Sequence, residues 1–168
     1  MMNPREVYRA HPTHDEIDDV LGQRGVAAIG TLNEDGSIHL AFVIYLHEGG
    51  RLFFETSSVT RKARNAAARS KATFLVHGTA SSGRSVMVSG EGEARVIQAD
   101  EAAAINRRIR IKYVTDDAIE GIDQAWTKLD DVAIEVTPQR WRSRTGAVLR
   151  EQTERAAGLD YDATWRED

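Results

Sequence analysis

Hydrophobic and polar residues alternate along three successive stretches near the start of the chain, and turn sequences separate them. The runs VAAIGTL, SIHLAFVIYL and RLFFET are rich in the β-branched and aromatic residues that are typical of strands. NEDG lies between the first two runs and HEGG between the second and third, and Asp-Gly and Gly-Gly favour the backbone torsions of a tight hairpin. The pattern from Val26 to Thr56 therefore predicts an antiparallel meander of three strands.

Three more strands are expected after residue 70. KATFLVHG begins at Lys71, a Gly/Ser loop follows, and SVMVSGEGEARVI contains glycines that favour bulges or bends. The last run, DVAIEVTPQRWRSRTG, contains Pro138, which predicts an edge strand or a bulge. Long, bent strands usually curl, so the expected fold class is mainly β (α+β): a small six-stranded antiparallel barrel with flanking helices.

Helical periodicity separates these strands. THDEIDDVLGQRG predicts a helix with Thr13 as its N-cap, and SVTRKARNAAARS predicts one whose apolar side is formed by Val59, Ala63, Ala66 and Ala67. QADEAAAINRRIRIKYV and DDAIEGIDQAWTKL predict two more. For the bases of the third helix we expect a solvated face or the rim of a dimer, and these bases are Arg107, Arg108, Arg110 and Lys112.

Composition indicates one domain in a reducing compartment. The 168 residues include no cysteine, which excludes disulfides and thiolate metal sites. The N-terminus lacks the apolar core of a signal peptide, and no apolar run is long enough to cross a bilayer. We expect a cytoplasmic protein with no membrane partner. Residues 1–148 should form the domain and residues 149–168 a polar tail with Tyr161 and Trp165 as apolar anchors.

Positive charge gathers in one place although the formal net charge is −4, which argues against a general nucleic-acid partner. Between Thr56 and Gly90 there are six bases and no acid. Arg61 and Lys62 lie near the start of the second helix, where the helix dipole disfavours cations. A phosphate bound by these cations, the helix N-terminus and the hydroxyls of residues 56–60 would reverse that preference. A solvated helix face with an ordinary N-cap is the alternative.

The order of several residues resembles the pyridoxamine 5'-phosphate oxidase-like family of FMN- and F420-binding split β-barrels. In that family the first strand ends in Thr-Leu, an Asp-Gly turn follows, and an aromatic third strand leads to Ser/Thr-Arg-Lys and often Asn. The corresponding residues are Thr31, Leu32, Asp35, Gly36, Phe53, Thr56, Thr60, Arg61, Lys62 and Asn65. The likeness is close over about a third of the chain and looser from residue 71 to residue 144.

The resemblance implies a homodimer that binds two cofactors at the subunit interface. Arg61 and Lys62 would hold the cofactor phosphate, with hydroxyl contacts from Thr56 and from Ser57 or Ser58. The ring would lie along backbone groups of Ala41, Phe42 and Val43. A Trp followed by an Arg on the last strand often reaches the partner's site in this family, and Trp141 with Arg142 or Arg144 is the nearest match.

The implied function is that of a flavin- or deazaflavin-dependent oxidoreductase acting on a small conjugated molecule. FMN is the expected cofactor and coenzyme F420 the alternative. The substrate-phosphate residues of the true oxidases are not recognisable, so vitamin B6 oxidation is not predicted. The competing readings are a haem- or tetrapyrrole-binding protein and a non-catalytic cofactor-binding dimer. No catalytic residue and no metal site are predicted, and His77 is the one histidine kept as a substrate contact.

Overall fold

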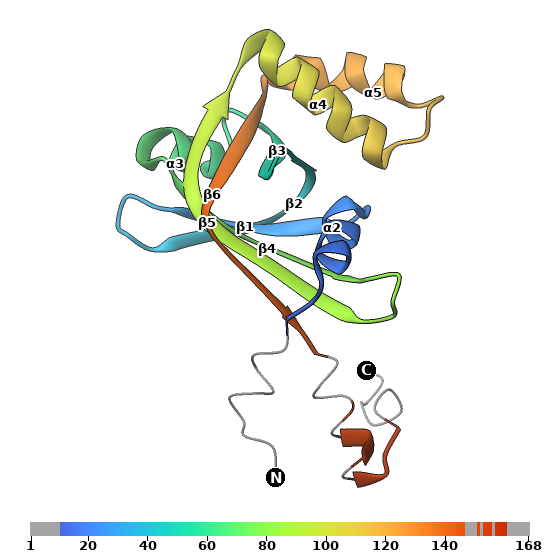
Figure 1. Cartoon of the computed structure of the whole chain (residues 1–168). Helices are drawn as coiled ribbons and strands as arrows, with labels where there is room; N and C mark the ends of the chain where they lie inside the picture. The colour runs from blue at the N-terminus through green and yellow to red at the C-terminus, as the bar shows by residue number, and fades with distance from the viewer. Residues whose placement is uncertain (1–10, 147–150, 152, 156, 161–168) are drawn as a thin grey trace.

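The computed structural model describes residues 11–146, 151, 153–155 and 157–160. Among these residues, six antiparallel strands form a closed barrel in the order β1-β2-β3-β6-β5-β4, which confirms the predicted fold class (Figure 1). The strands are β1 (Val26–Leu32), β2 (Ile38–Glu48), β3 (Arg51–Ser57), β4 (Lys71–Thr79), β5 (Ser85–Ile97) and β6 (Asp131–Thr145).

Helices occupy the connections that the sequence predicted. α2 (His14–Gly22) begins with a capping box in which the Thr13 hydroxyl accepts a hydrogen bond from the Glu16 N–H and the Glu16 carboxylate accepts one from the Thr13 N–H. α3 (Arg61–Arg69) connects β3 to β4, and α4 (Ala99–Tyr113), α5 (Ile119–Trp126) and a short 3-10 turn (Thr127–Leu129) connect β5 to β6. No helix of the described residues is both long and apolar enough to span a membrane.

The predicted bulge lies where β5 and β6 meet. Gly92 pairs with Pro138 and Glu91 with Arg140, so Gln139 is the extra residue on β6. A Cβ on Gly92 would lie 2.1 Å from the carbonyl oxygen of Thr137. Glycine is therefore required for this close approach of two backbones.

Helix α4 covers only part of the outer barrel surface. Its apolar side packs on outward residues of β3 and β6 and on part of β2, in a small core that includes Phe53, Ile105, Ile109 and Ala133. Figure 1 shows α4 and α5 together on one side of the barrel, with α3 at another. Ile97 at the end of β5 belongs to the same core, whereas outward apolar residues on β1, β4, the start of β5 and the first half of β2 are exposed: Val26, Leu75, Met87, Ile38, Leu40 and Phe42.

Two expectations about the helices are wrong. Of the residues predicted on the apolar side of α3, Val59 is 70% exposed because it lies in the turn before the N-cap Thr60 and not in α3, and Ala67 is exposed too. The buried residues of α3 are Ala63, Asn65 and Ala66. Arg110 was expected on a solvated face or a dimer rim, but it is only 4% exposed. Three carboxylates surround it, so its charge is compensated inside the protein. Tyr161 and Trp165 lie outside the described residues.

Candidate cofactor site

The barrel is split along one edge of β2. Residues 38–44 of β2 pair with β1, whereas its pairing with β3 covers only residues 45–48. Past Phe54, β3 pairs only with β6. None of the described strands pairs with the other edge of residues 38–44, so alternate backbone N–H and C=O groups along this edge are available to a ligand.

Ala41, Phe42 and Val43 lie on this open edge. If the register of β2 with β3 continued past its last pair, Val43 would lie opposite Thr56. The three side chains differ in exposure: Val43 is buried, Ala41 is half-buried and Phe42 is 75% exposed. The open edge of β2 therefore faces the same split as the segment that leads from β3 into α3.

The start of α3 carries two cations, of which Lys62 is half-buried and Arg61 is exposed and near enough to Asp35 to help lower the pKa of that carboxyl. Among the described residues neither Arg61 nor Lys62 forms an ion pair, and the first turn of α3 contains no acid. By their position, the backbone N–H groups of both residues have no acceptor within the helix. Burial lowers the pKa of the Lys62 amine, and no neighbouring acid opposes that shift. This end of α3 is thus a concentration of donors and positive charge.

The hydroxyl groups before α3 are not equally available. Thr60 donates its proton to the carbonyl of Ser57 at 2.9 Å, so Thr56 must be the donor in its 3.0 Å contact with the Thr60 hydroxyl. Ser58 donates to the carboxylate of Asp130, and its N–H to the Asp130 carbonyl at 3.1 Å. Ser57 is half-buried and its hydroxyl proton has no acceptor among the described residues. Of the predicted hydroxyl contacts, Ser57 is the one most able to donate to an anion.

A buried asparagine fixes α3 on the barrel. Asn65 is 7% exposed, and its amide donates to the Thr31 hydroxyl at 3.2 Å and to the Asn33 side-chain oxygen at 2.9 Å. Both acceptors belong to the end of β1 and the turn after it. Because Asn65 follows Lys62 by three residues, these bonds hold the cationic first turn of α3 in a defined position.

Trp141 and Arg144 lie far from this segment within one chain. Asp131 pairs with Ser57, and Trp141 is ten residues further along β6, which corresponds to about 33 Å of extended strand. Trp141 is 41% exposed and packs edge-on against Phe74, with ring centroids 5.3 Å apart. The structure brings the open edge of β2 and the start of α3 together, whereas Trp141 lies at the other end of β2, with its ring centroid 6.0 Å from that of His47. Among the described residues no contact joins Trp141 or Arg144 to the start of α3.

Other sites are less promising. A cavity of about 590 Å³ lies near the opposite end of α3, where bases of α3 and the strands face acids of β5: Arg69, Lys71, Arg140, Glu91 and Glu93. These charges nearly balance. The ring of His77 contacts the Ser85 hydroxyl at 2.9 Å. Among the described residues no group of three His, Cys, Asp or Glu side chains is placed to hold a metal ion.

Sequence reasoning missed a buried acidic pair beside the split. Glu55 is 7% exposed and immediately precedes Thr56, and Asp131 pairs with Ser57 in the register. Both carboxylates accept hydrogen bonds from Arg110. A signal was present: an acid inside the run FFET, which is buried on both faces, requires a cationic partner.

The closed strand order with one unpaired edge defines a split β-barrel. A family model for pyridoxamine 5'-phosphate oxidase matches residues 13–145. The chain therefore belongs to the pyridoxamine 5'-phosphate oxidase family. A comparison with curated protein sequences finds no match.

Several solved structures share this fold. A conserved hypothetical protein from Mycobacterium tuberculosis has a TM-score of 0.67 and 24% identity over 82% of this chain and 88% of its own. An F420 reductase has a TM-score of 0.56 and 21% identity over 78% of this chain and 98% of its own. The heme storage protein HutZ from Vibrio cholerae has a TM-score of 0.62 and 14% identity over 78% and 94%. At these identities the similarity establishes the fold alone.

Proposed function

We propose that this protein is a flavin- or deazaflavin-dependent oxidoreductase that performs two-electron chemistry on a small conjugated molecule. The observation that carries the proposal is the pair Arg61 and Lys62, which form no ion pair among the described residues and lie at the start of α3, beside the open edge of β2. The half-buried Lys62 favours an anionic partner, the exposed Arg61 adds a second positive charge, and the helix N-terminus adds N–H donors for the anion.

The donor set fits a cofactor phosphate followed by a planar ring. Arg61, Lys62 and the Ser57 hydroxyl would hold the phosphate, and the backbone of Ala41 to Val43 would bind the polar edge of the ring. The bound flavin or deazaflavin would supply the hydride chemistry, so the protein's part is to bind, orient and shield it. FMN is our first choice, and the similarity to an F420 reductase supports F420 as the second.

The site is completed in a homodimer. The part of the barrel that α4 leaves uncovered exposes large apolar side chains on β1, β2, β4 and β5: Val26, Ile38, Leu40, Phe42, Leu75 and Met87. The register places Phe42, Ala28 and Leu75 in one row, so these side chains form a continuous outer face. A contiguous apolar face of this kind is typical of a subunit interface. The partner subunit's Trp141 and the partner subunit's Arg144 would then reach the cofactor.

Haem binding is the alternative, and the similarity to HutZ supports it. We would incubate the purified protein separately with FMN, F420 and haem, remove free ligand by gel filtration, and record absorbance spectra. Retention of a flavin or deazaflavin at one per subunit is expected. Retention of haem alone would replace the redox proposal with tetrapyrrole binding. A retained flavin that no chemical or enzymatic donor reduces, or that passes no electrons to an acceptor, would favour a non-catalytic role.

A further inference from the structure

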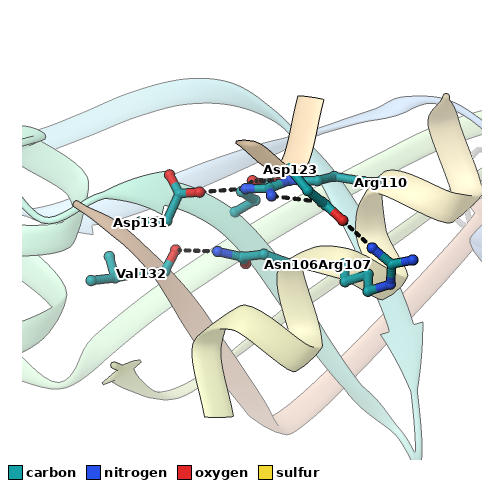
Figure 2. A network of polar contacts seen from close by, with 7 residues as sticks. Asn106, Arg107, Arg110, Asp123, Asp131 and Val132 are labelled. Carbon is teal, nitrogen blue, oxygen red and sulfur yellow. Dashed lines mark hydrogen bonds and ion pairs between the residues drawn. The ribbon is translucent and has the colours of Figure 1, made fainter. Parts of the chain in front are cut away.

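A buried arginine binds the strand residues next to the segment that leads to the proposed phosphate site. Arg110, on α4, donates from Nε to a Glu55 carboxylate oxygen at 2.8 Å and from Nη1 to Asp123 at 2.8 Å, and its Nη2 contacts both Glu55 and Asp131. Figure 2 shows Arg110 between Asp131 and Asp123, with Arg107 reaching Asp123 from the far side. One planar guanidinium thus joins two strands and two helices.

The strand residues that Arg110 holds belong to the segment that leads into α3. Glu55 is followed by Thr56, Asp131 pairs with Ser57, and Asp130 binds both the N–H and the hydroxyl of Ser58. Arg110 therefore fixes β3 and β6 at the level where the chain leaves the barrel for Arg61.

Among the described residues, Arg110 is the cation that pairs with all three acids. Glu55 is 7% exposed, and the side chains of Asp131 and Asp123 are 15% and 20% exposed. Removing the one cation they share would leave like charges facing one another in a poorly solvated place. The acids would then separate or draw in water, and the backbone of residues 55–58 would move with them.

We propose that Arg110 is a positioning residue for cofactor binding: it holds the Thr56–Ser58 segment, and through it the first turn of α3, in the geometry that accepts the cofactor phosphate. Arg110 itself does not contact the cofactor. The identity of the ligand in this inference rests on the proposed function. The ordering of the Thr56–Ser58 segment by Arg110 does not depend on it.

The test compares FMN with riboflavin, which has the same ring and no phosphate. We would measure dissociation constants by flavin fluorescence for the wild type, Arg110→Gln, Arg110→Lys and the control Arg107→Gln. Arg107 belongs to the same cluster, but its side chain is 57% exposed and, within the described part of the chain, pairs with Asp123 alone. If the wild type retains F420 instead, the matched pair is F420 and the deazaflavin without its phosphate-bearing tail.

Arg110→Gln should weaken FMN binding about tenfold or more, in the range that loss of supporting partners produces at metal sites, and leave riboflavin binding within about twofold. Arg110→Lys keeps the charge but loses the fork geometry, so it should give a smaller loss of FMN selectivity. Arg107→Gln should keep the wild-type ratio. Folded Arg110 variants with an unchanged FMN-to-riboflavin ratio would overturn the inference and leave the proposed function intact.

Amide hydrogen exchange separates this inference from the choice of cofactor. In the ligand-free protein, Arg110→Lys should raise exchange at residues 56–62 above the wild-type rate, with little change in β1 and β4. A wild type that retains no flavin or deazaflavin would contradict the proposed function. Amide hydrogen exchange would then be the remaining test of whether Arg110 orders residues 56–62. Unchanged protection at residues 56–62 in both Arg110 variants would refute that role.

Discussion

Replacing Glu55 by Gln should change how the stability of the protein depends on pH. Burial raises the pKa of the Glu55 carboxyl to about 6, and repulsion from Asp131 and Asp123 acts in the same direction while Arg110 opposes it. One carboxylate oxygen, Oε2, is buried and has no hydrogen-bond partner among the described residues. The ionised form of Glu55 is thus less favourable in the folded state than in water.

The sign and size of the effect follow from that pKa. The unfolded chain loses the Glu55 proton near 4.5, whereas the folded protein keeps it until about 6. Between these values the folded state binds more protons, so the Glu55 contribution to the free energy of unfolding falls as pH rises. A pKa difference of about 1.5 corresponds to about 2 kcal/mol. That contribution is fully present below pH 4.5 and lost above pH 6.

The assay is urea unfolding of the wild type, Glu55→Gln and the control Glu101→Gln at several pH values from 3.5 to 7.5. Glutamine keeps an acceptor for Arg110 but has no proton to lose. The difference in unfolding free energy, variant minus wild type, should therefore rise by about 2 kcal/mol across this range, or about 4–8 °C in Tm. Glu101 is 58% exposed on α4 and serves as the matched change of charge. A Glu55→Gln difference that stays constant with pH would refute the reasoning.

Three other substitutions test the fold and the interface. Gly92→Ala places a Cβ 2.1 Å from the Thr137 carbonyl and should lower the free energy of unfolding by about 3 kcal/mol; a loss below 1 kcal/mol in urea unfolding would mean that the bulge is not tight. Phe42→Glu should turn the proposed dimer into a folded monomer by light scattering, whereas Ile111→Glu, on α4, should leave the proposed dimer intact; a dimeric Phe42→Glu would place the interface elsewhere. Thr60→Ala removes the N-cap of α3 and should cost about 1 kcal/mol; no loss in thermal unfolding would contradict the assigned cap.

Local patterns predicted most of the fold because its strands and turns depend on short-range chemistry. Asp35-Gly36 lies in a turn whose glycine has a φ of +80°, and the glycines of β5 mark the bulge at Gly92. The N-cap Thr13 was also readable, since a hydroxyl before an acidic first turn has a local role. Closure of the barrel was predicted because long, bent strands usually curl. The order of the strands around the barrel was not predicted from the sequence.

The predictions from the hydrophobic and polar pattern were wrong where contacts between segments distant in the sequence decide whether a residue is buried. Arg110 lies among bases at positions typical of a solvated face, yet Glu55 lies 55 residues away along the chain, and no local signal pairs them. Val59 matched helical spacing, but the N-cap at Thr60 starts the helix after it. Ser58 was an equal candidate to Ser57 until the fold brought Asp130 to its hydroxyl. The burial and the partners of such residues can be assigned only once it is known which segments, distant in the sequence, lie side by side in the fold.

The central claim is that Arg61 and Lys62 serve an anionic cofactor. Its most direct test is the amount of FMN or F420 retained per subunit after gel filtration by Arg61→Glu with Lys62→Glu, compared with Arg24→Glu with Lys128→Glu. The control changes net charge equally at two exposed positions. We predict that the first variant stays a folded dimer and loses the cofactor, while the control retains it at the wild-type level. Undiminished retention by the first variant would contradict the claim.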